Sequence, residues 1–408
     1  MKPKILLVGY NGANNTGAEA KLLVIIDEIR QVLGEEVELT IPTLNEANIK
    51  RYVKEGPNLK VKTVRPWIFP VDVRRLVRDT DLVMLVEGST YMDTWGAALL
   101  WYYLLATRYA HGMHKPCIAY SVDAGKASRF NSWLIRREAT KTDMILARTQ
   151  KAADRLRNWG VKAPIEVTAD NAFAFQPNPR DNGLLRRVWP EANHVVGIAA
   201  EDIYVWPARM RLWDRKKYCY RWPYYYSHST ACQEKSKLLA DVLAVQADEI
   251  VEKYDKDIAL LSMEGLDADF GKKIQKMMKH ADRTRVFTSI EYNASQMTSV
   301  LHSLDLLITS RYHAGVLSLP EQVPQTAIGH DLRIKDLYGD LRTPELFVDH
   351  DDPDRYKLLS DNVETLFNEI DSMKLKLKAG YEDYKRREER NPELLRVFIE
   401  THCPGWLS

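Results

Sequence analysis

The sequence predicts an α/β protein with two Rossmann-like domains that face a central cleft, followed by a helical C-terminal tail. A chain of 408 residues is too long for one ordinary hydrophobic core. Short apolar runs alternate with longer amphipathic stretches, which implies parallel strands joined by right-handed helical crossovers. A Pro- and Asn-rich segment, residues 176–183, interrupts this alternation, which then restarts. It is therefore expected to link two domains.

The first domain is expected over residues 1–176. Its predicted strands are 4–8 (KILLV), 36–41, 82–86 (LVMLV), 116–121 (PCIAYS) and 144–147. Its predicted helices are 17–33, 95–111 and 151–159, and Gly160 is expected to cap the last one.

The second domain is expected over residues 184–345, with strands at 195–199, 257–262, 285–288, 304–309 and 325–328. The tail, 350–408, is charged and predicted to be helical, with an interruption at Pro392. In such folds ligands bind at the carboxyl ends of the strands, so the cleft between the domains is the expected site.

Composition limits the classes of partner. A formal net charge of +2 argues against a nucleic-acid partner. No apolar run approaches the length of a membrane-spanning helix, although the sequence allows peripheral contact with a membrane. The four cysteines, at 117, 219, 232 and 403, lack metal-ligand or disulfide-framework spacing. We therefore expect a cytoplasmic protein that uses neither a metal nor a cofactor.

An insertion at about 203–232 interleaves Trp and Tyr with Arg and Lys and fits neither a strand nor a helix period. It could be an irregular loop that packs its rings on a domain surface. Alternatively, its rings could stack on an acceptor sugar or on single-stranded nucleic acid.

Polar and glycine-rich segments follow three strands of the first domain. The opening loop offers Gly12, Asn14, Asn15, Gly17 and Glu19 at the start of a helix, where free N–H groups favour anions. The simpler explanation is a tight turn in which an Asn caps the helix. The ends of two further strands add candidates for the same cleft rim: Glu87, Gly88, Ser89, Thr90 and Asp123.

The second domain contributes Glu264 and the segment Ser310-Arg311-Tyr312-His313, where a strand passes into a helix. Arginine can bind a phosphate or carboxylate through two N–H groups, and histidine can hold an anion or carry a proton. An arginine and a histidine paired with buried carboxylates for purely structural reasons is the alternative.

Several segments together resemble the polysaccharide pyruvyl transferase family. They are GYNGANNTGAEA, EGSTYMD, ARTQKAADRLRNWGV, TADNAFAF and ITSRYHAGVLSLPEQVPQTAIGHDLRIKDL, and the resemblance runs from residue 4 to about 341. It implies a fold like that of the GT-B glycosyltransferases and transfer of pyruvate from phosphoenolpyruvate to sugar hydroxyls, leaving a ketal.

The resemblance also implies roles for individual residues. Arg311 and His313 would bind the donor and act in catalysis, and Arg148 would join Glu264 and Ser310 on the donor side. The acceptor would be a glycan or a lipid-linked sugar held by the N-terminal domain. Here the chain departs from the family pattern, with Ala18 in place of an acid and Glu87-Gly88-Ser89 in place of three glycines. A nucleotide-sugar glycosyltransferase with Glu264 on a ribose, and a non-catalytic glycan- or anion-binding protein, are the alternatives.

Overall fold

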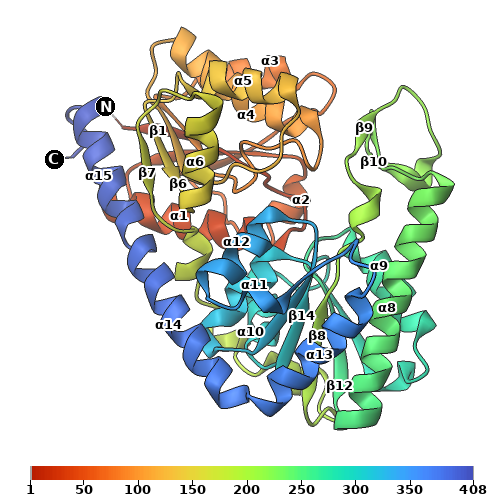
Figure 1. Ribbon diagram of the computed structural model, residues 1–408. Coiled ribbons are helices and arrows are strands. Elements are labelled where there is room, and N and C mark those ends of the chain that lie inside the picture. The colour runs from red at the N-terminus through yellow and green to blue at the C-terminus, as the bar shows by residue number, and fades with distance from the viewer. Residues whose placement is uncertain (1, 408) are drawn as a thin grey trace.

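The N-terminal domain is built on a seven-stranded parallel sheet in a computed structural model that describes residues 2–407 (Figure 1). The strand order is β3-β2-β1-β4-β5-β6-β7. The strands are β1 (Lys4–Val8), β2 (Glu38–Thr43), β3 (Leu59–Thr63), β4 (Leu82–Leu85), β5 (Cys117–Val122), β6 (Met144–Ala147) and β7 (Ile165–Val167). Of these, β3 and β7 were not predicted. The order reverses between β1 and β4, and this reversal opens a crevice at the carboxyl ends of the strands.

Alternate residues of β1 face opposite sides of the sheet. Ile5 and Leu7 pack against one layer of helices, and Leu6 and Val8 pack against the other. The first layer contains α1 (Thr16–Leu33), α2 (Glu46–Ile49) and α15 (Arg390–His402). The second contains α3 (Phe69–Arg78), α4 (Ala97–Gly112), α5 (Arg129–Ala139) and α6 (Gln150–Trp159). The first strand is continuously apolar because both faces of the sheet are covered.

The C-terminal domain is built on a six-stranded parallel sheet of order β13-β12-β8-β14-β15-β16. The strands are β8 (Val195–Ala199), β12 (Asp257–Ser262), β13 (Thr284–Thr288), β14 (Leu306–Thr309), β15 (Gln325–Gly329) and β16 (Phe347–Asp349). Its helices are α7 (Leu184–Val188), α8 (Thr230–Tyr254), α9 (Asp267–Met277), α10 (Ala294–Leu301), α11 (Tyr312–Ser318), α12 (Leu332–Asp340) and α13 (Arg355–Asn368). The predicted two-domain α/β architecture with parallel sheets is confirmed.

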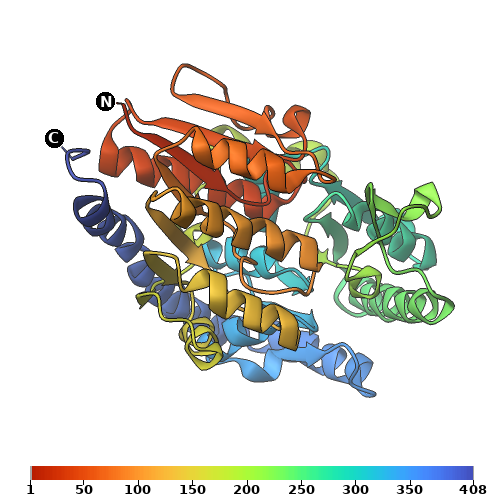
Figure 2. The ribbon, with the colours of Figure 1, turned by 90° about the horizontal axis from the view of Figure 1, so that it is seen from above.

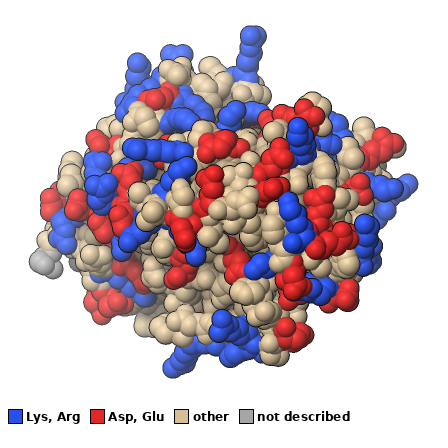
Figure 3. All heavy atoms as spheres, turned by 60° about the horizontal axis from the view of Figure 1, so that its bottom comes forward, with Lys and Arg blue, Asp and Glu red and all other residues tan. Residues whose placement is uncertain are grey.

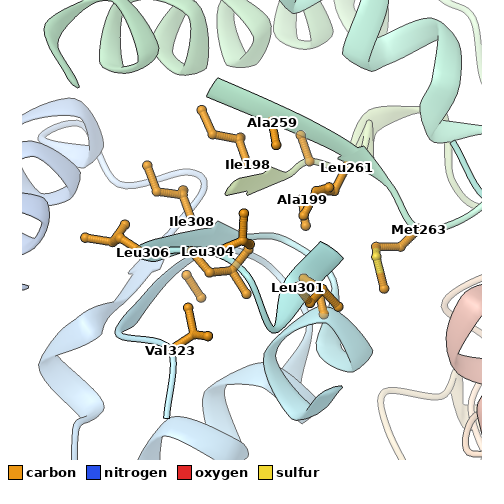
Figure 4. Close-up of a cluster of buried hydrophobic side chains, with 14 of the residues drawn as sticks. Ile198, Ala199, Ala259, Leu261, Met263, Leu301, Leu304, Leu306, Ile308 and Val323 are labelled. Atoms are coloured by element: carbon orange, nitrogen blue, oxygen red, sulfur yellow. The ribbon is translucent and has the colours of Figure 1, made fainter. Parts of the chain in front are cut away.

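Side chains from several strands and from α10 fill the core of the C-terminal domain (Figure 4). The figure labels Ile198, Leu261 and Ile308 from the sheet, with Leu301 and Leu304 from α10 and the loop that follows it. A Cβ at Gly197 would lie 2.4 Å from Cδ1 of Leu304. Glycine at this strand position therefore makes room for the leucine.

The insertion forms a small antiparallel sheet of β9 (Arg209–Met210), β11 (Tyr224–Tyr225) and β10 (Cys219–Arg221). We call residues 203–228 the arm. It leaves the C-terminal domain after β8 and extends toward the N-terminal domain (Figure 1). There Nη1 of Arg221 donates a hydrogen bond to the carbonyl of Leu44 (2.8 Å), and the ring of Trp222 lies 6.0 Å from that of Trp67. The arm therefore joins the two domains.

The C-terminal tail is helical, as predicted, and consists of α13, α14 (Ile370–Glu388) and α15. Helices α14 and α15 meet at Glu389, and Pro392 lies in the first turn of α15. Leu395, Phe398 and Ile399 of α15 pack in the core of the N-terminal domain, so the tail crosses from the second domain to the first. No helix within residues 2–407 is both long enough and apolar enough to cross a membrane.

The boundary between the domains was predicted at residues 176–184. Phe173 and Phe175 already pack in the core that contains the second sheet. The chain therefore reaches that core a few residues before the expected link begins.

Candidate functional site

A cavity of about 160 Å³ lies between the carboxyl ends of the two sheets. Its walls are loops that follow β1, β2, β4, β8, β12, β14 and β15, together with part of the arm. Parallel strands bring such loops to one edge of a sheet. The polar and aromatic residues that matter for its chemistry are Tyr10, Asn15, Glu87, Glu201, Trp206, Tyr220, Arg221, Glu264, Arg311, His313, Asp331 and Arg333.

Arg311 lies in the cavity wall among three carboxylates. Its Nε donates to Asp267 (2.9 Å), and Nη2 bonds the other oxygen of the same carboxylate. Its Nη1 lies 3.2 Å from Glu264 and 3.3 Å from Glu201. This guanidinium was predicted to bind a donor anion, but in the structure most of its N–H groups are already paired with carboxylates.

An excess of carboxylates around one arginine favours protonation. Burial raises the pKa of Glu201 to about 8, although the positive charge of Arg311 acts in the opposite direction. Burial also raises the pKa of Asp267 to about 6, again against the effect of Arg311. Burial thus favours the protonated form of Glu201 near neutral pH, and a buried protonated carboxyl can donate a hydrogen bond or a proton.

Glu264 connects this cluster to the N-terminal domain. It accepts hydrogen bonds from the hydroxyl of Tyr10 (2.9 Å) and from Nδ2 of Asn15 (3.1 Å). The Tyr10 hydroxyl is also hydrogen-bonded to the hydroxyl of Tyr220 in the arm. Both domains and the arm therefore meet at one carboxylate.

A second charged cluster lies behind the cavity. Nε of Arg148 donates to Asp123 (2.8 Å), and its Nη1 bonds Asp170. Nζ of Lys21 lies 3.6 Å from Asp170 and donates to the carbonyl of Ser121 (2.7 Å). Burial would raise the pKa of Asp170, but Lys21 and Arg148 hold it well below its usual range. This cluster has as many acids as bases and is sealed from solvent.

His313 lies between the Arg148 cluster and the cavity. Its ring lines the cavity, and its Nε2 lies 3.5 Å from Asp170 without a hydrogen-bond partner among the described residues. Burial lowers its pKa, so the imidazole is neutral. A Cβ at Gly17 would lie 2.0 Å from Nδ1 of His313. Glycine at the start of α1 thus allows the close contact between the domains.

Some of the residues proposed from sequence line the cavity. They are Asn15, Gly17, Glu87, Ser89, Glu264, Ser310, Arg311 and His313.

The others lie behind it. Gly12 sits in a tight turn against Thr43, Thr90 bonds the carbonyl of Glu87, and Asn14 and Glu19 pair with the C-terminal domain. Gly88 and Asp123 contact Arg148, which is itself fully buried. The expected direct contact of Arg148 with the donor is therefore not what the structure offers, because its guanidinium is enclosed by two aspartates.

Glu201, Tyr10 and the pair Asp331–Arg333 line the cavity but were not predicted from the sequence. Each follows a predicted strand, so the rule applied to the other strand ends could have found them. Arg333 bonds Asp331 through Nε (2.8 Å), and its guanidinium lies 5.4 Å from the ring of Trp95. Lys21 and Asp170 carried no comparable signal. Among residues 2–407, no group of three or more His, Cys, Asp or Glu is arranged to hold a metal ion.

Solved structures with a similar fold are sugar-nucleotide enzymes. UDP-N-acetylglucosamine 2-epimerase from Rickettsia bellii aligns over 100% of both chains with a TM-score of 0.64 and 11% identity. MnaA from S. aureus, in a co-structure with UDP, aligns over 98% of this chain and 97% of its own (TM-score 0.64, 10% identity). UDP-GlcNAc 2-epimerase from Neisseria meningitidis, bound to UDP-GlcNAc, aligns over 98% of this chain and 100% of its own (TM-score 0.61, 10% identity). At these identities the likeness shows the fold alone, which is GT-B-like, as predicted.

No curated protein matches the chain. The family model for polysaccharide pyruvyl transferase matches residues 15–331. This match takes in strands β2 to β15 and includes every residue of the Arg311 and Arg148 clusters. The chain therefore belongs to the polysaccharide pyruvyl transferase family of enzymes.

Proposed function

We propose that the protein transfers pyruvate from phosphoenolpyruvate to two hydroxyls of a glycan or lipid-linked sugar, forming a cyclic ketal in the cytoplasm without a cofactor. Membership of the family supports pyruvyl transfer in general. The observation that supports the donor and the chemistry is the position of Glu201, a buried carboxyl 3.3 Å from the guanidinium of Arg311 in the cavity wall, where burial raises its pKa to about 8.

Phosphoenolpyruvate reacts as an enol ether once its methylene carbon, C3, gains a proton. Glu201 would deliver that proton, which makes C2 electrophilic. One sugar hydroxyl adds to C2 and gives its proton to Glu264. The C2–O bond to phosphate then breaks, and Glu264 passes this proton to the departing phosphate. The second hydroxyl then adds to C2, and its proton restores Glu201. The products are the ketal and inorganic phosphate.

Anionic groups of the donor require cations at the cavity surface. Arg221 donates one hydrogen bond, to the carbonyl of Leu44, so its other N–H groups can bind a ligand. Arg333 lines the cavity and is paired with one carboxylate, Asp331. The neutral ring of His313 can donate one hydrogen bond. We assign to these side chains the binding of carboxylate and phosphate, and to Arg311 the orientation of Glu201 and Glu264.

One observation favours a second candidate, glycan binding without transfer. The three carboxylates around Arg311 leave the cavity less cationic than a donor with two anionic groups would prefer. A neutral sugar needs no such cations. Sugar-nucleotide transfer, with Glu264 on a ribose, is the remaining enzymatic alternative.

Thermal unfolding in the presence of ligands separates the three. A ligand at a hundred times its Kd stabilises the native state by about 2.7 kcal/mol. We expect phosphoenolpyruvate to raise Tm and UDP-GlcNAc or a GDP-sugar to leave it unchanged. Phosphate release should then depend on added acceptor glycan. Stabilisation by UDP-GlcNAc alone would favour the glycosyltransferase, and stabilisation by glycans alone would favour the binding protein.

A further inference from the structure

Exposed aromatic side chains lie in two stretches of the chain, residues 67–133 of the N-terminal domain and residues 213–222 of the arm. Among residues 2–407 the exposed Trp and Phe side chains are Trp67, Trp101, Phe130, Trp133, Trp213 and Trp222. Their exposure ranges from 39% for Trp101 to 81% for Trp213. The arm and the start of α3 add the exposed apolar residues Met210, Leu212 and Val71. Adjacent exposed rings mark an interaction site, and Trp67 contacts Trp222 while Phe130 contacts Trp133.

The two stretches belong to one end of the molecule. Trp101, Phe130 and Trp133 lie on α4 and α5, which share a face of the N-terminal sheet with α3. The contact between Trp67 and Trp222 joins the arm to this end. In Figure 1 α3, α5 and the arm reach the upper edge, and in Figure 2 the same helices face the viewer with the arm beside them. We call this end the aromatic-basic face.

The face is strongly basic although the whole chain is nearly balanced, with 58 Lys and Arg against 56 Asp and Glu. In α3, α4, α5 and residues 209–220 the acidic residues are Asp72, Glu138 and Asp214, and Asp79 directly follows α3. The basic residues are Arg74, Arg75, Arg78, Arg108, Arg129, Arg136, Arg137, Arg209, Arg211, Arg215, Lys216 and Lys217. The end of the molecule seen in Figure 3 instead mixes acidic with basic side chains.

The combination of tryptophan with arginine and lysine matches the surface of an anionic bilayer. Tryptophan settles at the level of the lipid headgroups, where its ring is partly apolar and its N–H is hydrated. Lysine and arginine are attracted to anionic headgroups. We propose that the aromatic-basic face docks on membranes that contain anionic lipid, with Trp213 at the arm tip entering the headgroup region.

Docking would have a consequence for substrate delivery. Trp206, Tyr220 and Arg221 line the cavity, while Trp213 and Lys216 of the same arm lie at the surface. The arm therefore connects the docking face to the cavity. A lipid-linked acceptor could reach the cavity with its lipid still in the bilayer. This last step rests on the proposed function, but docking itself does not.

Vesicle co-sedimentation of the full chain, without substrates, tests the proposal. We expect binding to vesicles of phosphatidylcholine mixed with phosphatidylglycerol, little binding to phosphatidylcholine alone, and release at high salt. Each basic residue near an anionic surface contributes a factor of about five. The triple change Arg215→Glu, Lys216→Glu and Lys217→Glu should therefore weaken binding at least about 100-fold. The tryptophan substitution Trp213→Ser should weaken it as well, by removing an interfacial anchor.

Helix α14 supplies matched controls. Lys374, Lys376 and Lys378 are exposed, and Leu375 is 71% exposed. Replacing the three lysines by Glu, or Leu375 by Ser, should leave vesicle binding unchanged. Absence of binding to the anionic vesicles, or equal losses in the α14 variants, would overturn the proposal. Self-association or binding of single-stranded RNA that the arm variants abolish, without vesicle binding, would assign the face to that partner instead.

Discussion

Arg148 and Arg311 each follow a buried strand, one in each domain, and each bonds at least two carboxylates. Their surroundings differ in charge balance and in access. Around Arg148, the positive charge of Lys21 balances the negative charge of the second aspartate, and the whole cluster is buried. Around Arg311, three carboxylates share one cation at the cavity wall. Lys21 and Arg148 together hold the pKa of Asp170 well below its usual range, whereas burial raises the pKa of Glu201 to about 8 despite Arg311. A carboxyl of the second kind can supply a proton to a reaction.

The largest effect is expected for Arg148→Met. This substitution leaves Asp123 and Asp170 buried with one cation between them, and breaking a buried ion pair costs about 3–5 kcal/mol. Denaturant unfolding should show that loss. Arg396, which is exposed on α15, provides the control: Arg396→Met should change stability by less than about 0.5 kcal/mol. Equal effects of the two substitutions would remove the distinction drawn for the Arg148 cluster.

Glu201→Gln tests the proton in the other cluster. Loss of a general acid lowers turnover by about 10²–10⁴, and binding of phosphoenolpyruvate should persist because a neutral amide replaces a neutral acid. Assays at saturating donor, with calorimetric titration, measure both. Glu393→Gln on α15 is the control, since Glu393 is exposed. A fully active Glu201→Gln enzyme would move the proton donor elsewhere.

The pH dependence of stability sharpens the same point. Burial raises the folded-state pKa of Glu201 to about 8 from an ordinary value near 4.5, so the folded protein holds the proton more tightly than the unfolded chain. Relative to Glu201→Gln, the parent should therefore lose stability as pH rises from about 4.5 to about 8. Unfolding curves of both proteins across that range check this. A constant difference would place the pKa near its ordinary value.

Gly17→Ala disturbs the close contact between the start of α1 and the ring of His313. The added methyl would overlap the ring of His313, and overpacking of this kind costs about 1–3 kcal/mol. A lowered Tm and weaker donor binding are the expected results. Gly112 is the control, because nothing lies within 4 Å of a Cβ built there. If Gly17→Ala behaved like Gly112→Ala, the close approach of α1 and His313 would not be required.

Arg311→Lys should weaken ligand binding by a modest factor. Lysine keeps the charge but cannot hold Asp267 and Glu264 together, so the cavity wall should reorganise. We expect donor affinity to fall about tenfold, as for one lost hydrogen bond to a charged group. Titration with phosphoenolpyruvate measures it. Unchanged affinity would show that Arg311 neither contacts nor orients the donor site.

The predicted strands were found where both faces of a sheet are covered. KILLV and LVMLV are continuously apolar for that reason. The missed strand β3, LKVKT, exposes lysine at an edge of the sheet, and β7 and β16 have only three residues each. Their patterns are too short or too polar to distinguish them from loops.

The site was predictable in position but less so in chemistry. The strand-end rule placed Glu264, Arg311 and His313 at the cavity. The partners of Arg311 come from segments that follow β8 and β12, more than forty residues away in sequence. The raised pKa of Glu201 depends on burial beneath the arm, whose Trp206 donates a hydrogen bond to it (3.0 Å), and no local sequence pattern reports that burial. Arg148 looked like a ligand residue because sequence does not show the two aspartates that enclose it.

The course of the tail sets the order in which the protein can be completed during synthesis. Leu395, Phe398 and Ile399 of α15 cover a face of the sheet to which β1 contributes Ile5 and Leu7. At typical ribosomal rates, roughly 10–50 s separate the emergence of the last N-terminal strand from that of α15. During this interval α1 and α2 cover part of that apolar face, and the part that α15 covers in the finished protein stays open to solvent.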